Sequence, residues 1–215
     1  MSGLRIQVLA QRTVSVGVNC YLVFDEASGE AAVIDPGGQA ENVCDMLNDQ
    51  GCALKYIILT HGHFDHIMCT AELSRRTGAP ICMSMADEDF IGDSVLNAAD
   101  FAKVNPVKPF AVDRYLNEGD RVFLGRSFLT VMETPGHTPG GISLYTPGYL
   151  LCGDTILKGT TGRMDLPGAD PYLIRKTIQE KIYALPNDTI ILCGHNETTT
   201  VGYEKKNNDT VRIQL

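Results

Sequence analysis

The most constraining feature of this chain is residues 60–66, which read T-H-G-H-F-D-H. This segment holds three of the five histidines in the chain, together with one aspartate. It follows the apolar run Tyr56–Leu59, so His61 and His63 alternate at the end of a predicted strand and project to the same side. Imidazole and carboxylate are ligands that a borderline divalent cation such as zinc binds readily. The segment therefore predicts a metal site that offers two ligands to each of two adjacent cations.

Three further residues of the same chemistry each follow a predicted strand. His137 lies in T-P-G-H-T-P-G, Asp154 in C-G-D-T and His195 in C-G-H-N. The flanking glycine or proline lets the backbone turn sharply and approach a centre closely. A single histidine after a strand is usually structural, but here every histidine outside the first segment occupies such a turn. Packing alone does not explain this distribution, which favours a shared role in the metal site.

Composition bounds the class of protein. The chain has 215 residues, 44% of them hydrophobic and 20% charged, which is ordinary for one globular domain with a substantial core. A net charge of -8 without a Lys/Arg cluster argues against a nucleic-acid partner. No apolar run reaches the ~20 residues of a membrane span, and the N-terminus has no signal-peptide core. Seven scattered cysteines without a C-x-x-C pair indicate reduced thiols and a cytoplasmic location. Two of them, Cys152 and Cys193, lie two residues before a candidate ligand.

Apolar patterning predicts strands and helices in a repeated order. Strands are predicted at residues 4–9, 18–24, 31–34, 56–59, 81–84, 121–124, 128–132, 142–145, 149–152 and 189–193. Helices are predicted from Ala40 to Gly51, over 67–77, from Asp170-Pro171 onward, and over 198–206. The order indicates two similar halves with sheets inside and helices outside.

Residues 85–110 have a weaker pattern, which predicts one or two short helices that could lie over a site. We interpret the acidic residues there as a solvated face rather than as ligands. These residues are Asp87, Glu88, Asp89, Asp93 and Asp100.

Together these motifs resemble the metallo-β-lactamase superfamily of hydrolases, and within it the glyoxalase II (hydroxyacylglutathione hydrolase)-like members. The resemblance extends from residues 33–38 to 198–204 and implies a single domain over 1–215, an αββα sandwich of the α/β (α+β) class. It implies three roles for the candidate ligands. His61, His63 and His137 would hold one metal; Asp65, His66 and His195 would hold the other; Asp154 would bridge both. Asp35 would orient a ligand histidine without touching metal.

The resemblance also excludes activities. Zinc β-lactamases lack the bridging aspartate, so Asp154 argues against antibiotic hydrolysis as the native role. Members that process nucleic acid carry basic segments that this acidic chain lacks. The flavin-coupled di-iron members have glutamate at the position of His63.

Substrate recognition is predicted from residues 159–165, which match a glutathione-contacting segment of glyoxalase II. Arg163, and with it Lys158, would hold a substrate carboxylate. The alternative for Arg163 is a salt bridge to Asp165 or Asp170. Thr161 and the Met164-Asp165 pair depart from the family pattern, and the chain ends at Leu215 without the C-terminal glutathione-binding extension.

Two functional classes follow, with a third behind them. The first is a binuclear hydrolase of a small-molecule thioester such as S-lactoylglutathione, with a smaller acyl thioester or a lactone as the other substrates. Two cations sharing one water would make it a hydroxide near neutral pH, and Asp65 would orient it. The second class is an iron-dependent persulfide dioxygenase that uses one iron at the His61/His63/His137 side. The third is a metal-stabilised protein without catalysis. Zinc is the expected metal, although the same ligands accept iron or manganese. The sequence does not indicate an oligomeric state.

Overall fold

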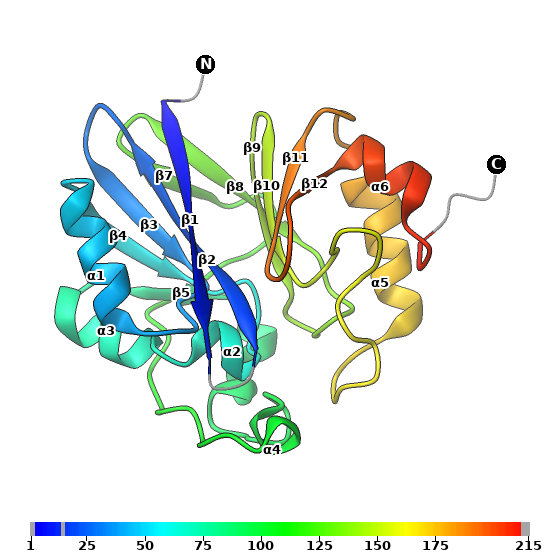
Figure 1. Cartoon of the computed structure of the whole chain (residues 1–215), viewed down its shortest axis with the longest axis horizontal. Coiled ribbons are helices and arrows are strands. Elements are labelled where there is room, and N and C mark those ends of the chain that lie inside the picture. Colours follow the sequence, from blue (N-terminus) through cyan, green and yellow to red (C-terminus); the bar gives the residue numbers. More distant parts are fainter. Residues whose placement is uncertain (1–2, 14–15, 212–215) are drawn as a thin grey trace.

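The computed structural model describes residues 3–13 and 16–211. Residues 1–2, 14–15 and 212–215 lie outside the described residues, and with them the parts of the signal-peptide and C-terminal-extension predictions that concern the two chain ends. Two six-stranded sheets face each other, and each is built from one continuous part of the chain (Figure 1).

The first sheet comes from the N-terminal half and has its strands in chain order. Its first three strands pair antiparallel and the remaining pairs are parallel. The strands are β1 (Leu4–Arg12), β2 (Gly17–Asp25), β3 (Glu30–Ile34), β4 (Ala53–Ile58), β5 (Ile81–Met83) and β6 (Arg114–Tyr115).

The second sheet comes from the C-terminal half, again in chain order. Only β10 and β11 pair in parallel, because the long connection between them carries a helix. The strands are β7 (Arg121–Leu124), β8 (Ser127–Glu133), β9 (Ile142–Thr146), β10 (Tyr149–Gly153), β11 (Ile190–Cys193) and β12 (Thr199–Thr200).

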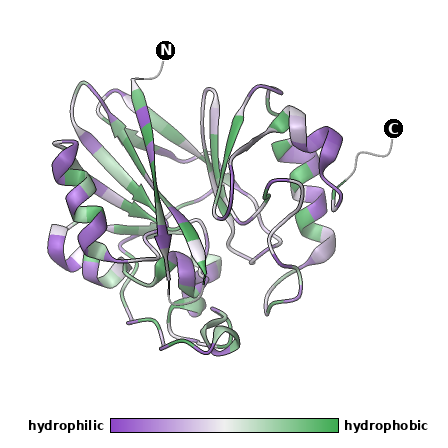
Figure 2. Cartoon of the chain, viewed as in Figure 1, coloured by the Kyte–Doolittle hydropathy of each residue, from purple (hydrophilic) through white to green (hydrophobic). Residues whose placement is uncertain are grey.

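Helices cover the outer face of each sheet, which gives the αββα order of layers (Figure 1). The first sheet carries α1 (Ala40–Asp49), α2 (Phe64–Ile67) and α3 (Thr70–Thr77). The second carries α5 (Pro171–Thr177), its π-helical continuation (Ile178–Ile182) and α6 (Val201–Asn207). The outer helices show purple and green residues in alternation, as expected of helices with one buried face (Figure 2). No helix of the described residues is both long and apolar enough to cross a bilayer.

Three layers of apolar side chains hold the sandwich together. The middle layer joins the two sheets and includes Val23, Ile58 and Leu144. The outer layers pack the helices onto the sheets, with Val43 on the first side and Ile174 on the second. The seven cysteines form no disulfide, and Cys152 and Cys193 are buried in the second outer layer.

The predicted halves, the αββα order and the helix start at Asp170-Pro171 are confirmed. Asp170 caps α5 by accepting hydrogen bonds from the backbone N–H groups of Tyr172 and Leu173, both at 2.9 Å. The short helices predicted in residues 85–110 are a 3-10 helix (Met85–Ile91) and α4 (Ala99–Ala102).

Two helix predictions need correction. The helix predicted over 67–77 is split into α2 and α3, because the N–H of Cys69 bonds to the carbonyl of Pro36 rather than within a helix. The helix predicted from Thr198 begins only at Val201. Thr199 pairs with Ile191 in the sheet, and the Thr200 hydroxyl caps the helix through the N–H of Tyr203. Strand β6 had no counterpart among the predicted strands.

Candidate metal centre

The loop that follows β4 is fixed at its first residue by Asp35. The Asp35 carboxylate accepts hydrogen bonds from the Thr60 backbone N–H and the Thr60 hydroxyl, both at 2.7 Å. The Thr60 hydroxyl in turn lies 3.0 Å from Nδ1 of His61. The other carboxylate contact of Asp35 is to Nδ1 of His66, at 2.9 Å. One buried carboxylate therefore positions two of the predicted ligands, consistent with the orienting role predicted for it.

The loop also requires glycine at position 62. A Cβ added to Gly62 would lie 2.4 Å from Cβ of Phe90, so a larger residue would push the loop away from the 3-10 helix. The close approach, together with the hydrogen bond from the Gly62 N–H to Asp87, holds the turn against the 3-10 helix.

The first ligand group joins the N-terminal half to the loop after β8. The ligand atoms of His61, His63 and His137 all lie within 4.8 Å of one another, and the three side chains are buried. His63 Nδ1 is 2.9 Å from His137 Nε2. His137 Nδ1 donates to the carbonyl of Arg163 at 2.8 Å, which leaves Nε2 free to bind.

The second ligand group joins the N-terminal half to the loop after β11. Asp65, His66 and His195 again have ligand atoms within 4.8 Å of one another. His195 Nε2 lies 3.3 Å from His66 Nε2 and 3.2 Å from the Asp65 carboxylate. His195 Nδ1 donates to the carbonyl of Gly17, so its Nε2 also points to the centre.

Asp154, at the end of β10, lies between the two groups. One carboxylate oxygen is 3.2 Å from His195 Nε2 and 3.7 Å from His137 Nε2, and the other is 3.6 Å from His66 Nε2. A single carboxylate therefore reaches members of both groups.

The donor set fits divalent cations. Nε2 of His61 and Oδ1 of Asp154 are buried without a hydrogen-bond partner, which is costly for polar atoms. Ring nitrogens also face each other in both groups, where lone pairs repel unless a proton or a cation lies between them. A cation in each group would satisfy these atoms.

The electrostatics of the site point the same way. Burial lowers the pKa of His61 well below its usual value and that of His63 to about 3, so both are neutral, as metal ligands must be. Burial disfavours the charged forms of Asp154 and His195, but their mutual attraction outweighs it. The pKa of Asp154 is consequently lowered and that of His195 is raised to about 11. The carboxylates thus favour a positive charge at this place, and a bound metal cation would supply that charge in place of a proton.

Asp87 is a site residue that the sequence interpretation missed. The prediction of a solvated acidic face is right for Glu88, Asp89, Asp93 and Asp100 but wrong for Asp87, which is fully buried. Its carboxylate accepts hydrogen bonds from the Gly62 N–H at 2.9 Å, the Thr138 hydroxyl at 2.7 Å and the Gly140 N–H at 2.6 Å.

Asp87 therefore clamps the turn between His61 and His63 to the loop after His137. One sequence signal could have found it. Phe90 and Ile91 are apolar residues at positions i+3 and i+4, so a helical pattern places Asp87 on their face, which is the buried face in the structure.

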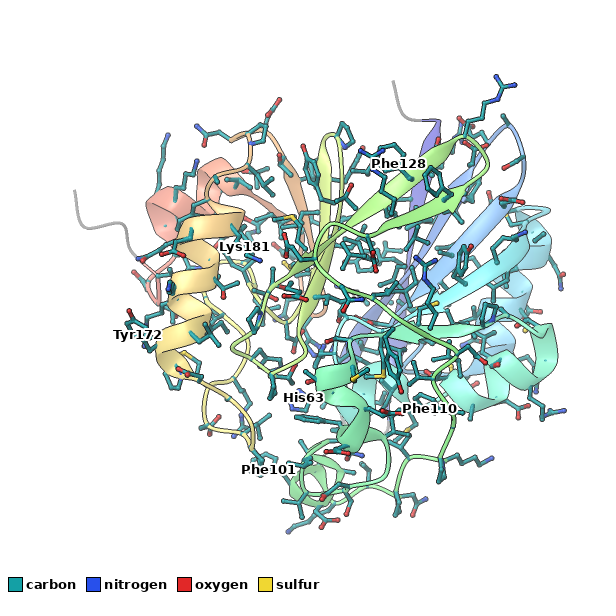
Figure 3. All side chains as sticks on the ribbon, turned by 180° about the vertical axis from the view of Figure 1, so that it is seen from behind. His63, Phe101, Phe110, Phe128, Tyr172 and Lys181 are labelled. Atoms are coloured by element: carbon teal, nitrogen blue, oxygen red, sulfur yellow. The ribbon has the colours of Figure 1, made fainter. Side chains whose placement is uncertain are left out.

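A cavity of about 290 Å³ opens beside the ligand groups. Five predicted ligands line it, namely His63, Asp65, His137, Asp154 and His195. Seven apolar residues line it as well, and they are Val16, Phe64, Ala98, Phe101, Ala102, Leu157 and Leu166. Figure 3 shows His63 and Phe101 at the same end of the molecule.

The predicted substrate-binding cations are both paired. Arg163 lines the cavity, forms a two-bond salt bridge with Asp165 at 2.9 and 2.7 Å, and stacks over the ring of Phe101. This is one of the two ion pairs that the sequence left open for Arg163. Lys158 pairs with Glu197 and is not part of the lining. Whether either residue contacts substrate stays a prediction.

The model of the metallo-beta-lactamase superfamily matches residues 14–195, and the chain belongs to this superfamily of metal-dependent hydrolases. It is 34% identical over 193 residues to the hydroxyacylglutathione hydrolase GloC of Haemophilus influenzae, covering 88% of this chain and 91% of that protein.

Two solved structures show the same fold over nearly the whole chain. BLEG-1, described as a B3 metallo-beta-lactamase, is 29% identical with a TM-score of 0.89, over 96% of this chain and 99% of that one. TTHA1623, solved in a di-iron-bound form, is 32% identical with a TM-score of 0.83, over 94% and 99% of the two chains.

Proposed function

We propose that this protein is a binuclear metal-dependent hydrolase that cleaves a thioester. The observation that carries the proposal is the position of Asp154, whose two oxygens reach both ligand groups. A shared carboxylate screens the repulsion between two cations and fixes their separation. The name of the Haemophilus influenzae relative supports a thioester of glutathione as the substrate class.

The residues of the chain have distinct tasks in this reaction. When bound, two divalent cations supply hydroxide near neutral pH and stabilise the negative charge that develops on a substrate carbonyl. Neighbouring His66 and His195 outweigh burial and lower the pKa of Asp65, so its carboxylate is ionised and can orient the nucleophile. Within the described residues, the cavity lining contains no serine or cysteine to act as a nucleophile, and its one threonine hydroxyl, that of Thr161, donates to the Gly162 carbonyl. A thiolate leaves without help from an acid, which suits this lining.

S-lactoylglutathione is the first substrate to test, followed by smaller acyl thioesters and lactones. In this proposal Arg163 and Lys158 hold a carboxylate of the thiol half of the substrate. Either cation would exchange its present partner, Asp165 or Glu197, for that carboxylate.

A second candidate is an iron-dependent persulfide dioxygenase. It would use one iron at the first ligand group, where His61, His63 and His137 could hold a metal ion without the second group. The di-iron form of TTHA1623 supports iron as a metal for this fold.

The test loads the full chain with zinc or with iron and measures three reactions. The expected result is thiol release from S-lactoylglutathione by protein that holds two metals per chain. We expect the two metals to lie roughly 3.5–4 Å apart. Oxygen uptake with glutathione persulfide, without thioester cleavage, would replace the hydrolase with the dioxygenase. Ring opening of a β-lactam at a higher kcat/KM than thioester cleavage would replace the substrate class. Saturation at one metal per chain would reject the binuclear site.

A further inference from the structure

The cavity beside the ligand groups has two contrasting parts. Its floor carries the carboxylates and imidazoles of the candidate metal centre, and its wall is mostly apolar, with Thr161, Arg163 and Asn196 as its polar residues. The wall combines Phe101 and its neighbours on α4 with Leu157 and Leu166 from the C-terminal half. Few polar groups face a substrate away from the floor, so the enclosed part of a substrate gains most from apolar contact.

Phe101 lies in this wall although the fold does not need it. Its side chain is 63% exposed, and it belongs to none of the three apolar layers. The Arg163 guanidinium stacks over one face of the ring, so the rest of the exposed ring is the surface beside the cavity that a ligand can cover.

The segment that holds Phe101 is strained at both ends. Ala98, with φ of 63°, and Lys103, with φ of 55°, bracket α4 in the left-handed region that residues other than glycine rarely adopt. The only other such residues in the described chain are Asp35, which bonds to His66, and Asn196, which follows His195. Three of the four strained positions therefore adjoin the same site, since Ala98 and Asn196 line the cavity and Asp35 bonds to His66.

The charge of the cavity lining and the volume of the cavity further limit which ligands can bind there. Arg163, the cation of the lining, is paired with Asp165 and, in the proposed function, binds a carboxylate of the thiol half, so the wall offers no free cation to a charged acyl group. The volume of about 290 Å³ equals roughly ten waters at ~30 Å³ each. That space holds an acyl group and the scissile bond, but the rest of a glutathione-sized thiol must lie outside.

We infer that the apolar wall formed by Phe101, Leu157 and Leu166 binds the acyl half of the substrate, and that thioesters with a short unbranched alkyl acyl group are cleaved at a higher kcat/KM than S-lactoylglutathione. This inference rests on the proposed thioester hydrolysis and names its substrate class. An alkyl chain packs on the wall, whereas the hydroxyl of a lactoyl group would lose water without gaining a partner there. The thiol half extends past Arg163 to solvent.

The experiment compares acetyl, butanoyl, hexanoyl and lactoyl thioesters of glutathione with the metal-loaded full chain. We expect kcat/KM to rise roughly threefold per methylene, on the order of 100-fold from acetyl to hexanoyl. The variant Phe101→Ala should lower kcat/KM for the hexanoyl thioester by about tenfold and for the acetyl thioester by less than about twofold. Tyr172→Ala is the matched control, because Tyr172 is 76% exposed and outside the cavity lining.

Calorimetric binding of hexanoate, acetate and lactate to the same protein separates this inference from the proposed function. One outcome is that no thioester is cleaved, hexanoate binds at least about tenfold more tightly than acetate, and Phe101→Ala removes this difference in affinity. That outcome would reject the proposed thioester hydrolysis and support the inferred alkyl-binding wall. Rates that do not depend on acyl length, or an equal loss for both thioesters in Phe101→Ala, would overturn the inference. So would equal binding of hexanoate and acetate.

Discussion

The two ligand groups differ in how they are enclosed. His137 of the first group is 5% exposed, whereas His195 of the second is 14% exposed and is anchored to the carbonyl of Gly17. Asp87 also stabilises the first group, because its carboxylate accepts hydrogen bonds from the turn between His61 and His63 and from the loop after His137. Enclosed, oriented ligands lose less freedom when they bind, so we expect the first group to bind its cation more tightly and release it more slowly. Asp154 reaches members of both groups.

The largest effect is expected from a change at Asp154, because its carboxylate reaches both ligand groups. Asp154→Ala should lower hydrolysis on the order of 100-fold or more, about 2.7 kcal/mol in the barrier, and reduce metal content in both groups. Circular dichroism should still show the wild-type fold, because Asp154 lies at a strand end rather than in an apolar layer. Activity above about a tenth of wild type, a loss below ~1.4 kcal/mol, would reject the bridging role.

A smaller effect is expected where the first group alone is disturbed. Asp87→Asn places an amide N–H against the donors of Gly62 or Gly140, so the clamp loses a bond and buries an unpaired donor. We expect the affinity of the first group for its cation to fall roughly 10-fold, with the second group little changed. Chelator competition that resolves the two binding steps measures this.

Asp89→Asn is the matched control, since it makes the same charge change two residues away on an exposed side chain. An equal fall in both binding steps of Asp87→Asn, or the same fall in Asp89→Asn, would show that Asp87 does not act on one group selectively.

The smallest effect is expected at Arg163, whose backbone and side chain have separate tasks. Its carbonyl accepts from His137, and this bond survives in Arg163→Ala, so metal affinity of the first group should stay within about twofold. The lost guanidinium should raise KM about three- to tenfold and leave kcat nearly unchanged, since it removes uniform binding. Steady-state kinetics with S-lactoylglutathione decide this. A fall in kcat with KM unchanged would contradict the predicted substrate contact.

The sequence could predict those features of the site that depend on local pattern, but not those that depend on how the two sheets face each other. The first motif was accessible because four candidate ligands lie within six residues after one apolar run. His137, Asp154 and His195 were recognisable as strand-end residues, but their assignment to one or other group came from family resemblance. The grouping depends on how two sheets face each other, which local pattern does not contain.

The misses have one physical cause. The split of the helix at Cys69 depends on a carbonyl of Pro36, and the burial of Asp87 depends on donors from two other loops. In both places a partner distant in the chain decides the local structure. Local propensity is a weak guide wherever such a partner competes with it.

The division of the chain between the sheets has a consequence for assembly. The first sheet ends at Tyr115 and the second begins at Arg121, so one short linker joins them. Each ligand group takes members from both sides of that linker. A bound cation would therefore link the two halves of the chain, and its binding free energy would stabilise the packing of one half against the other. Two separately produced fragments, cut between Tyr115 and Arg121, should associate more tightly with metal than without it.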